Sequence, residues 1–338
     1  MKPRGLNQEF AVIGENIHTT RVVLRNGKLM GTSPAGEEAV RYTTVAGETR
    51  YLAVPEAMKT RQDYEEGRIK HVMIAVRRAM AGEEEGLLYL RTLVEKQARA
   101  GADFLDLNVD EISLKHAEQL AAMEWLVRTV EPMSPVPLAI DSSNQETIQA
   151  GIAACARKPL LNSASLERIE ALDVAARKGL PVVVTAAGAG GMPQNAEERV
   201  ANASKMVEAA LEKGIPLEDL YVDALVFPIS VDGQFVIHCL DAIRALRDNY
   251  GPKIHITGGL SNVSFGLPCR KLINEAFMNL AVEAGADGGI VDPVANDLNQ
   301  VFTADRESKP YRLALEMLLG RDRNCKDFLR AYRKGELG

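Results

Sequence analysis

Eight short apolar runs are spread along this chain, and most of them end in a small polar tail. In a closed ring of parallel strands, the carboxyl-terminal tips of the strands lie around one opening. Carboxylates and carboxamides at those tips would form a single polar site above a packed apolar barrel. The pattern therefore predicts both a fold and the location of the chemistry. The tails include Glu15-Asn16, Asp106-Leu107-Asn108, Asp141, Asn162, Asp223, Asn262 and Asp292.

The apolar runs lack strict alternation, which is typical of strands buried on both faces. Segments with helical apolar spacing lie between them, and regular alternation with short links favours one (β/α)8 barrel, the TIM barrel, in the α/β class. A doubly wound sheet is the alternative, but no Gly-rich phosphate turn follows the first run. We expect strands at about 10–15, 103–109, 136–141, 158–163, 181–186, 220–226, 253–259 and 288–292, and helices at about 67–100, 115–131, 144–156, 167–178, 196–213, 234–249, 269–284 and 309–319.

Two segments fall outside this alternation. Residues 20–66 are rich in glycine and proline, and we expect an insertion after the first strand, with 22–24 and 41–44 as strands of a hairpin. Residues 321–338 are charged and predict a peripheral tail, so the barrel should span 1–320. We also expect Asn144 to cap the helix that follows it.

Composition excludes several classes of protein. The 338 residues carry a formal charge of −6, which argues against binding along a nucleic-acid backbone. The four cysteines are far apart and form no metal-binding pair, so we expect free thiols. No apolar run is long enough to cross a membrane, and the first residues do not resemble a signal peptide. We expect a cytoplasmic protein.

Three strand-end residues suit a polar heterocycle. A carboxylate such as Asp141 can accept two parallel N–H bonds from a 2-aminopyrimidine edge, and the carboxamide of Asn162 can donate and accept towards the same ring. Asp223 is flanked by apolar residues that disfavour an unpaired charge, which favours a function for it. For Asp141 and Asn162 the alternative is a helix cap or a turn, and the residues alone leave that open.

Other candidates follow the same logic. Asn262 comes after Gly258-Gly259, where the backbone can approach a ligand closely. Asp106 and Asn108 alternate along their strand, so we expect at most one of them to face a given side. Asp292 before Pro293 is either a lid residue or a turn residue, and we favour the structural role. No histidine pair has metal-ligand spacing and no nucleophile motif is present, so we expect no bound metal and a site that works by positioning and hydrogen bonding.

Six motifs resemble those of the methyltetrahydrofolate:corrinoid methyltransferases. These enzymes are pterin-binding TIM barrels, related to dihydropteroate synthase and to the folate module of cobalamin-dependent methionine synthase. The resemblance covers about 10–18 and 100–295. The motifs are Leu-Asp-Leu-Asn-Val (105–109), Ala-Met-Glu-Trp-Leu-Val (122–127), Ile-Asp-Ser-Ser-Asn (140–144), Leu-Asn-Ser-Ala-Ser (161–165), Glu-Asp-Leu-Tyr-Val-Asp (218–223) and Gly-Leu-Ser-Asn-Val-Ser (259–264).

The resemblance implies a role for each matched position. Asp141, Asn162 and Asp223 would hold the pterin ring, and Asn262 would hydrogen-bond N5 as the catalytic residue. Weaker assignments as pterin-binding residues fall on Glu15, Asn108 and Arg270. The implied reaction moves a methyl group between N5 of tetrahydrofolate and the cobalt of a corrinoid.

The resemblance also implies partners. The chain shows no cobalamin-binding signature of the Asp-x-His-x-x-Gly type, so the corrinoid would arrive on a partner protein, and the enzyme would form a homodimer. Tetrahydrofolate could receive the methyl group during demethylation of a methylated growth substrate, although the direction of transfer is left open. Two alternatives remain. One is an enzyme like dihydropteroate synthase, although the late strands lack the expected lysine; the other is a non-catalytic pterin-binding module.

Overall fold

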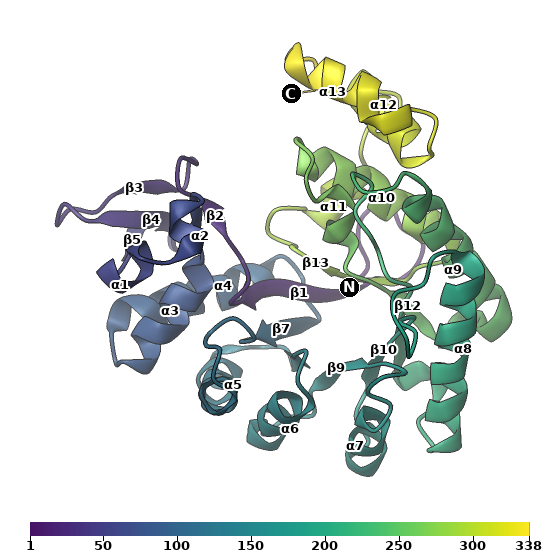
Figure 1. The fold of residues 1–338 in the computed structure, drawn as a ribbon, viewed down its shortest axis with the longest axis horizontal. Coiled ribbons are helices and arrows are strands. Elements are labelled where there is room, and N and C mark those ends of the chain that lie inside the picture. The colour runs from purple at the N-terminus through teal and green to yellow at the C-terminus, as the bar shows by residue number, and fades with distance from the viewer. Residues whose placement is uncertain (338) are drawn as a thin grey trace. The chain divides into compact units, whose positions relative to one another are not determined.

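The chain folds as a (β/α)8 barrel, as its alternating pattern predicts, and the computed structural model describes residues 1–337. Eight parallel strands form one sheet in the order β12-β11-β10-β9-β8-β7-β1-β13 (Figure 1). Most strand residues are buried, which explains the continuous apolar runs. The strands are β1 (Ala11–His18), β7 (Phe104–Asn108), β8 (Leu138–Asp141), β9 (Leu160–Ala164), β10 (Val182–Thr185), β11 (Leu220–Asp223), β12 (His255–Thr257) and β13 (Gly288–Val291).

The chain divides into two compact units, each described here by itself. The N-terminal unit comprises Gly14–Ala100 and Phe104–Pro159, and the C-terminal unit comprises Met1–Ile13, Gly101–Asp103 and the chain from Leu160 onward. This division differs from the predicted boundary at residue 320 between a barrel and a C-terminal tail. That boundary stays a prediction.

In the N-terminal unit, helices cover two of the strands. Helices α5 (His116–Val130) and α6 (Gln145–Ala154) pack on β7 and β8. The predicted helix over 67–100 is wrong in one respect. It is two helices, α3 (His71–Met80) and α4 (Glu84–Arg99), because Gly82 has a φ of +84° and reverses the chain between them. Asn144 caps α6 as predicted, since its side chain accepts a hydrogen bond from the Glu146 amide at 2.8 Å.

The insertion forms its own small sheet, and the predicted pairing within it is wrong. Strand β4 (Glu38–Thr43) lies between β3 (Met30–Thr32) and β5 (Thr49–Ala53), while β2 (Val23–Leu24) pairs with β6 (Arg68–Ile69). The two expected strands therefore do not pair with each other: β2 pairs with a strand more than 40 residues later, and β4 pairs with its neighbours in the chain. Two short helices, α1 (Glu56–Lys59) and α2 (Gln62–Glu65), follow the sheet, and β5 packs on α3 and α4 (Figure 1).

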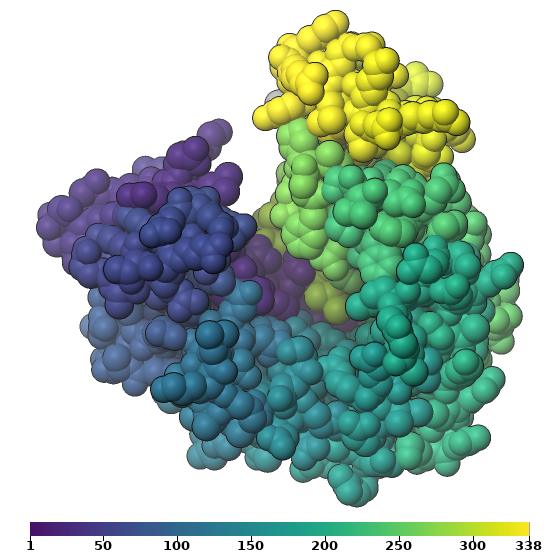
Figure 2. Space-filling model, in the orientation of Figure 1, coloured from purple at the N-terminus to yellow at the C-terminus, as the bar shows by residue number. Residues whose placement is uncertain are grey.

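The C-terminal unit carries five helices close to their predicted positions. They are α7 (Ala171–Lys178), α8 (Ala196–Glu212), α9 (Gln234–Tyr250), α10 (Arg270–Ala284) and α12 (Lys309–Leu318). A short helix, α11 (Leu298–Val301), follows β13, and α13 (Lys326–Arg333) packs on α12 (Figure 1). The residues of this last part of the chain form the yellow group in the space-filling view (Figure 2). Phe328 of α13 is fully buried. No helix within residues 1–337 is long and apolar enough to span a membrane.

Candidate functional site

In the N-terminal unit, two predicted site residues are joined directly. Asn108 ends β7, Asp141 ends β8, and the two residues are paired in the strand register. The Nδ2 of Asn108 donates to Oδ2 of Asp141 at 2.9 Å, and Oδ1 of Asn108 accepts from the Asp110 amide at 3.0 Å. The other carboxylate oxygen of Asp141 has no hydrogen-bond partner among residues 1–337, so it is available to a ligand donor.

Asp106 faces the same side of β7 as Asn108, which contradicts the expectation that only one would. Residues two apart on a strand point to the same face, so the expectation misapplied the two-residue period. Asp106 is fully buried, and its Oδ2 lies 2.9 Å from Nε2 of His18 at the end of β1. Ligand atoms of His18, Asp106 and Asp141 all lie within 4.8 Å of one another.

The imidazole and the two carboxylates of this group are side chains of the kind that coordinate divalent cations. The structure shows a direct hydrogen bond between His18 and Asp106 instead. The expectation that no metal is bound therefore stays a prediction.

The charges in this group depend on one another. Burial and the neighbouring charge of Asp106 raise the pKa of Asp141 to about 7, while His18 and the Asn108 hydrogen bond oppose that rise. Burial lowers the pKa of His18, but its hydrogen bond to Asp106 and the surrounding carboxylates outweigh that effect and raise it overall. The charge on Asp141 therefore depends on the neighbouring carboxylate of Asp106 and on the imidazole of His18.

In the C-terminal unit, a row of polar residues crosses three strand ends. Thr185, Asp223 and Thr257 are paired in register on β10, β11 and β12. Oδ1 of Asp223 accepts from the Leu225 amide at 2.7 Å. Its second oxygen has no hydrogen-bond partner among residues 1–337. The buried hydroxyl of Thr257 has none there either. Burial raises the pKa of Asp223 to about 6.

Asn262 lies in a short 3-10 turn, Leu260–Ser264, directly after β12. Its carboxamide has no hydrogen bond among residues 1–337. Gly259 leaves room for this carboxamide, because a Cβ at position 259 would lie 2.7 Å from Nδ2 of Asn262. Arg270 braces the same turn: its Nε donates to Oγ of Ser264 and its Nη2 to the Ser261 carbonyl, both at 2.9 Å.

The remaining predicted residues lie on the strands that the sequence indicated or directly after one. Asn162 lies within β9, is only 6% exposed, and is paired in register with Val183 of β10. Glu15 lies within β1, where Arg21 approaches its carboxylate at 3.5 Å. Asp292 accepts hydrogen bonds from the amides at 294 and 295, which confirms it as a turn residue.

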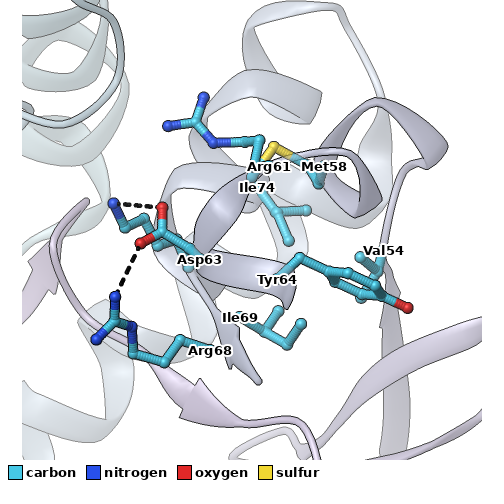
Figure 3. A pocket seen from close by; sticks show the side chains of 9 residues that line it. Val54, Met58, Arg61, Asp63, Tyr64, Arg68, Ile69 and Ile74 are labelled. Carbon is cyan, nitrogen blue, oxygen red and sulfur yellow. Dashed lines mark ion pairs between the residues drawn. The ribbon is translucent and has the colours of Figure 1, made fainter. Parts of the chain in front are cut away.

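A pocket near the insertion contains none of these residues. Its cavity volume of about 10 Å³ leaves room for a single water molecule. Asp63 pairs there with Lys70 and Arg68 (Figure 3). A pterin ring cannot enter it. Its lining comprises Val54, Met58, Arg61, Asp63, Tyr64, Arg68, Ile69, Lys70 and Ile74.

Two residues beside the candidate site were not predicted. His18 lies three residues after Glu15 at the end of the same strand, which is a signal that the sequence carries. Arg199 of α8 is fully buried and bonds to the loop that follows Asp223. Its sequence context, Ala-Glu-Glu-Arg-Val, is that of an exposed helix face, so nothing in the sequence indicated burial.

The model of the family described as pterin binding enzyme matches residues 82–292. The chain belongs to the pterin-binding enzymes. The matched segment begins before β7 and ends after β13, and so includes Asn108, Asp141, Asn162, Asp223 and Asn262. Membership in the pterin-binding enzymes confirms that the chain is an enzyme and agrees with the family named by the sequence motifs.

Three individual proteins show how similar this chain is to particular pterin-binding enzymes and related proteins. The chain is 32% identical over 266 residues to a methylcorrinoid:tetrahydrofolate methyltransferase of Eubacterium limosum, covering 76% of this chain and 91% of the relative. It is 29% identical over 287 residues to methionine synthase of Mycobacterium leprae, covering 77% of this chain but 22% of that longer protein. A dihydropteroate synthase from Xanthomonas albilineans has a TM-score of 0.52 at 22% identity, covering 63% of this chain and 83% of that one, and shows a shared fold alone.

Proposed function

We propose that this pterin-binding enzyme is a methyltransferase that moves a methyl group between N5 of tetrahydrofolate and the cobalt of a corrinoid carried by a partner protein. The observation that carries the proposal is the similarity to a methylcorrinoid:tetrahydrofolate methyltransferase over 91% of that relative's length. A match confined to a fragment would support only pterin binding. Here the match extends over most of the relative's length.

The polar groups of the strand ends fit a pterin. A pterin has a guanidine-like edge with N–H donors, and carboxylates are its natural acceptors. Asp141 and Asp223 each keep one oxygen without a hydrogen-bond partner among residues 1–337. We propose that these oxygens bind the N–H groups of the ring, and that Asn162 bonds to the same ring. Asn108 would hold Asp141 in place through the hydrogen bond already described.

Asn262 is proposed to act at the reacting nitrogen. When the methyl group leaves N5, that nitrogen must depart as a neutral amine, which requires a proton or a strong hydrogen bond at N5. The oxygen of a carboxamide can accept a hydrogen bond from protonated N5 without adding a second fixed charge. In the opposite direction, N5 attacks the cobalt-bound methyl group with its electron pair, cobalt keeps the electrons of the broken bond, and N5 releases its proton.

We propose that the enzyme works in this second direction, with a methylated corrinoid protein as donor and tetrahydrofolate as acceptor, during demethylation of a growth substrate. The name of the Eubacterium limosum relative, which places methylcorrinoid first, favours that direction. Homodimer formation and the pterin-binding roles of Glu15 and Arg270 stay predictions.

The deciding experiment measures methyl transfer with the purified protein. Methylcobalamin and tetrahydrofolate should yield methyltetrahydrofolate and Co(I) cobalamin, and the absorbance of cobalamin reports the reaction. Binding of tetrahydrofolate without any turnover would instead indicate a non-catalytic module. Condensation of p-aminobenzoate with a dihydropterin pyrophosphate would indicate a dihydropteroate synthase.

Asn262→Ala tests the catalytic assignment. We expect the methyl-transfer rate to fall by about a hundredfold, because losing one preorganised hydrogen bond at a reacting atom costs roughly that much, while pterin affinity changes by less than about tenfold. Single-turnover rates and equilibrium binding separate the two quantities. Asn249→Ala, which alters an exposed residue of α9, is the matched control. Equal losses of rate and affinity in Asn262→Ala would remove the role at N5.

A further inference from the structure

Arg199 is the largest fully buried side chain of the C-terminal unit, with an exposed fraction of 0%. Burying a guanidinium costs several kcal/mol unless its hydrogen bonds and its charge are compensated, so such a residue requires an explanation. No carboxylate within residues 1–337 lies at ion-pair distance from it. Its compensation therefore has to come from other groups.

Backbone carbonyls supply most of that compensation. Nε donates to the carbonyl of Ala224 at 3.1 Å, and Nη2 donates to that of Leu225 at 3.3 Å. Nη1 donates to the carbonyl of Asn195, one turn earlier on the chain, at 3.3 Å. The guanidinium carbon also lies 4.7 Å from the centre of the Phe227 ring, in a cation–π contact. Two of these carbonyls and the ring belong to the loop directly after Asp223.

One peptide group in that loop joins Arg199 to Asp223. The peptide between residues 224 and 225 accepts a hydrogen bond from Arg199 at its oxygen and donates one to Oδ1 of Asp223 from its nitrogen, at 2.7 Å. Leu225 itself has a φ of +61°, a left-handed conformation that is costly for leucine and persists only when the surroundings hold it. Arg199 binds the carbonyls on both sides of that residue.

The guanidinium also acts on the carboxylate through its charge. Burial raises the pKa of Asp223 to about 6, and the Leu225 amide and the charge of Arg199 oppose that rise. The other titratable group that interacts with Asp223 is the thiol of Cys239 on α9. The register neighbours of Asp223 on β10 and β12 are threonines and carry no charge. Glu198, on the same helix as Arg199, acts on Arg199.

We propose that Arg199 is the positioning residue for Asp223: it holds the peptide that orients this carboxylate and places a positive charge near it. The inference rests on the proposed pterin-binding role of Asp223, and it adds a residue that contacts no ligand itself. Arg199 would keep Asp223 ionised and correctly directed, so that the carboxylate can accept the N–H groups of the pterin.

A double-mutant cycle tests the coupling without any pterin. Above a pH of about 6 the ionised, buried carboxylate of Asp223 lowers stability, and Arg199 reduces that cost. At pH 8, Asp223→Asn should therefore raise the urea unfolding midpoint of an Arg199→Met protein more than that of the wild type. At pH 5 the folded proteins carry a protonated carboxyl in both backgrounds, so the difference should vanish. An effect of Asp223→Asn that is the same in both backgrounds at both pH values would overturn the proposal.

Binding of methyltetrahydrofolate as a function of pH tests the functional consequence. In Arg199→Met, the pH below which affinity falls should move upward, leaving affinity about tenfold weaker near pH 6.5. Arg199→Lys keeps the positive charge but loses the planar guanidinium that donates to both carbonyls of the loop. This variant should bind methyltetrahydrofolate more weakly at every pH, with the pH dependence of the wild type. Lys205→Met, at an exposed position of α8, is the control.

The outcomes separate this inference from the proposed function. If wild-type protein binds no folate, the proposed function fails, and the stability cycle still decides whether Arg199 and Asp223 are coupled. If Arg199→Met binds folate with unchanged affinity and pH dependence, Arg199 is purely structural. Should that variant not fold, Arg199→Lys decides: wild-type affinity in the lysine variant would overturn the positioning role.

Discussion

Asp141 and Asp223, both proposed to bind the pterin, have pKa values of about 7 and about 6, well above the usual value for aspartate. Burial raises the pKa of both Asp141 and Asp223, and a second carboxylate, Asp106, contributes to the rise for Asp141. Only the ionised form accepts two N–H bonds, so ligand binding should depend on pH in a range where ordinary aspartates are already fully charged. The ligand's own N–H donors would then favour the ionised state.

We predict that affinity for methyltetrahydrofolate falls as the pH is lowered from about 8 to about 5.5. The sign follows from the raised pKa values, because protonation of Asp141 near pH 7 removes an acceptor. Asp141→Asn should weaken binding by about ten- to a hundredfold at pH 8 and should reduce the pH dependence. Isothermal titration at several pH values measures both quantities. An affinity in Asp141→Asn that equals the wild type would refute the assignment.

Among the elements, the turn after β12 shows how backbone geometry places Asn262, the residue proposed to act at N5. Gly259 leaves room for the carboxamide of Asn262, and Arg270 fixes the turn through the Ser261 carbonyl and the Ser264 hydroxyl. The carboxamide is thus held by its backbone, and its polar atoms stay free of other side chains within residues 1–337.

Gly259→Ala should slow methyl transfer with little loss of stability. The added methyl would lie 2.7 Å from Nδ2 of Asn262, the far end of a flexible side chain, so that side chain moves rather than the backbone. We expect a rate reduction of about tenfold or more. Gly233→Ala, where nothing lies within 4 Å of the new methyl, is the control. An unchanged rate in Gly259→Ala would show that methyl transfer does not depend on the exact position of the Asn262 carboxamide.

Close helix packing in the N-terminal unit leads to a prediction about stability. A Cβ on Gly86 of α4 would lie 2.5 Å from the backbone oxygen of Ala75 and from the backbone nitrogen of Ala79, both on α3. Backbone atoms cannot rotate away, so Gly86→Ala should lower the free energy of unfolding by about 1–3 kcal/mol. Urea denaturation measures it, with Gly31→Ala at an open site as the control. A stability equal to that of the wild type would mean that α3 and α4 separate without cost.

At the scale of the whole molecule, helix α13 near the end of the chain has a buried face as well as an exposed one. Helix α13 packs on α12 and buries Phe328 completely, although the segment is highly charged. An amphipathic helix needs only a few apolar positions to dock, so charged composition alone does not make a segment peripheral.

Phe328→Ala should therefore lower the free energy of unfolding by about 3 kcal/mol, the usual cost of removing a buried aromatic ring. Pterin affinity should not change, because no predicted site residue lies in α12 or α13. Thermal unfolding and folate titration provide the two readings. Tyr332→Ala, at a position that is 48% exposed on the same helix, should have a much smaller effect. Similar losses for both variants would indicate that α13 contributes through propensity rather than packing.

The sequence by itself determined the fold class, most strand and helix positions, and the residues at the strand ends. It could do so because buried parallel strands require continuous apolar runs, and because polar residues at their tips interrupt those runs visibly. Tertiary structure decided what depends on contacts between distant segments: the strand pairing of the insertion, the His18–Asp106 hydrogen bond, and the burial of Arg199. The local sequence indicates whether a segment is buried and which secondary structure it forms. The charge state and orientation of a side chain depend on the particular atoms that pack against it, and these come from distant parts of the chain.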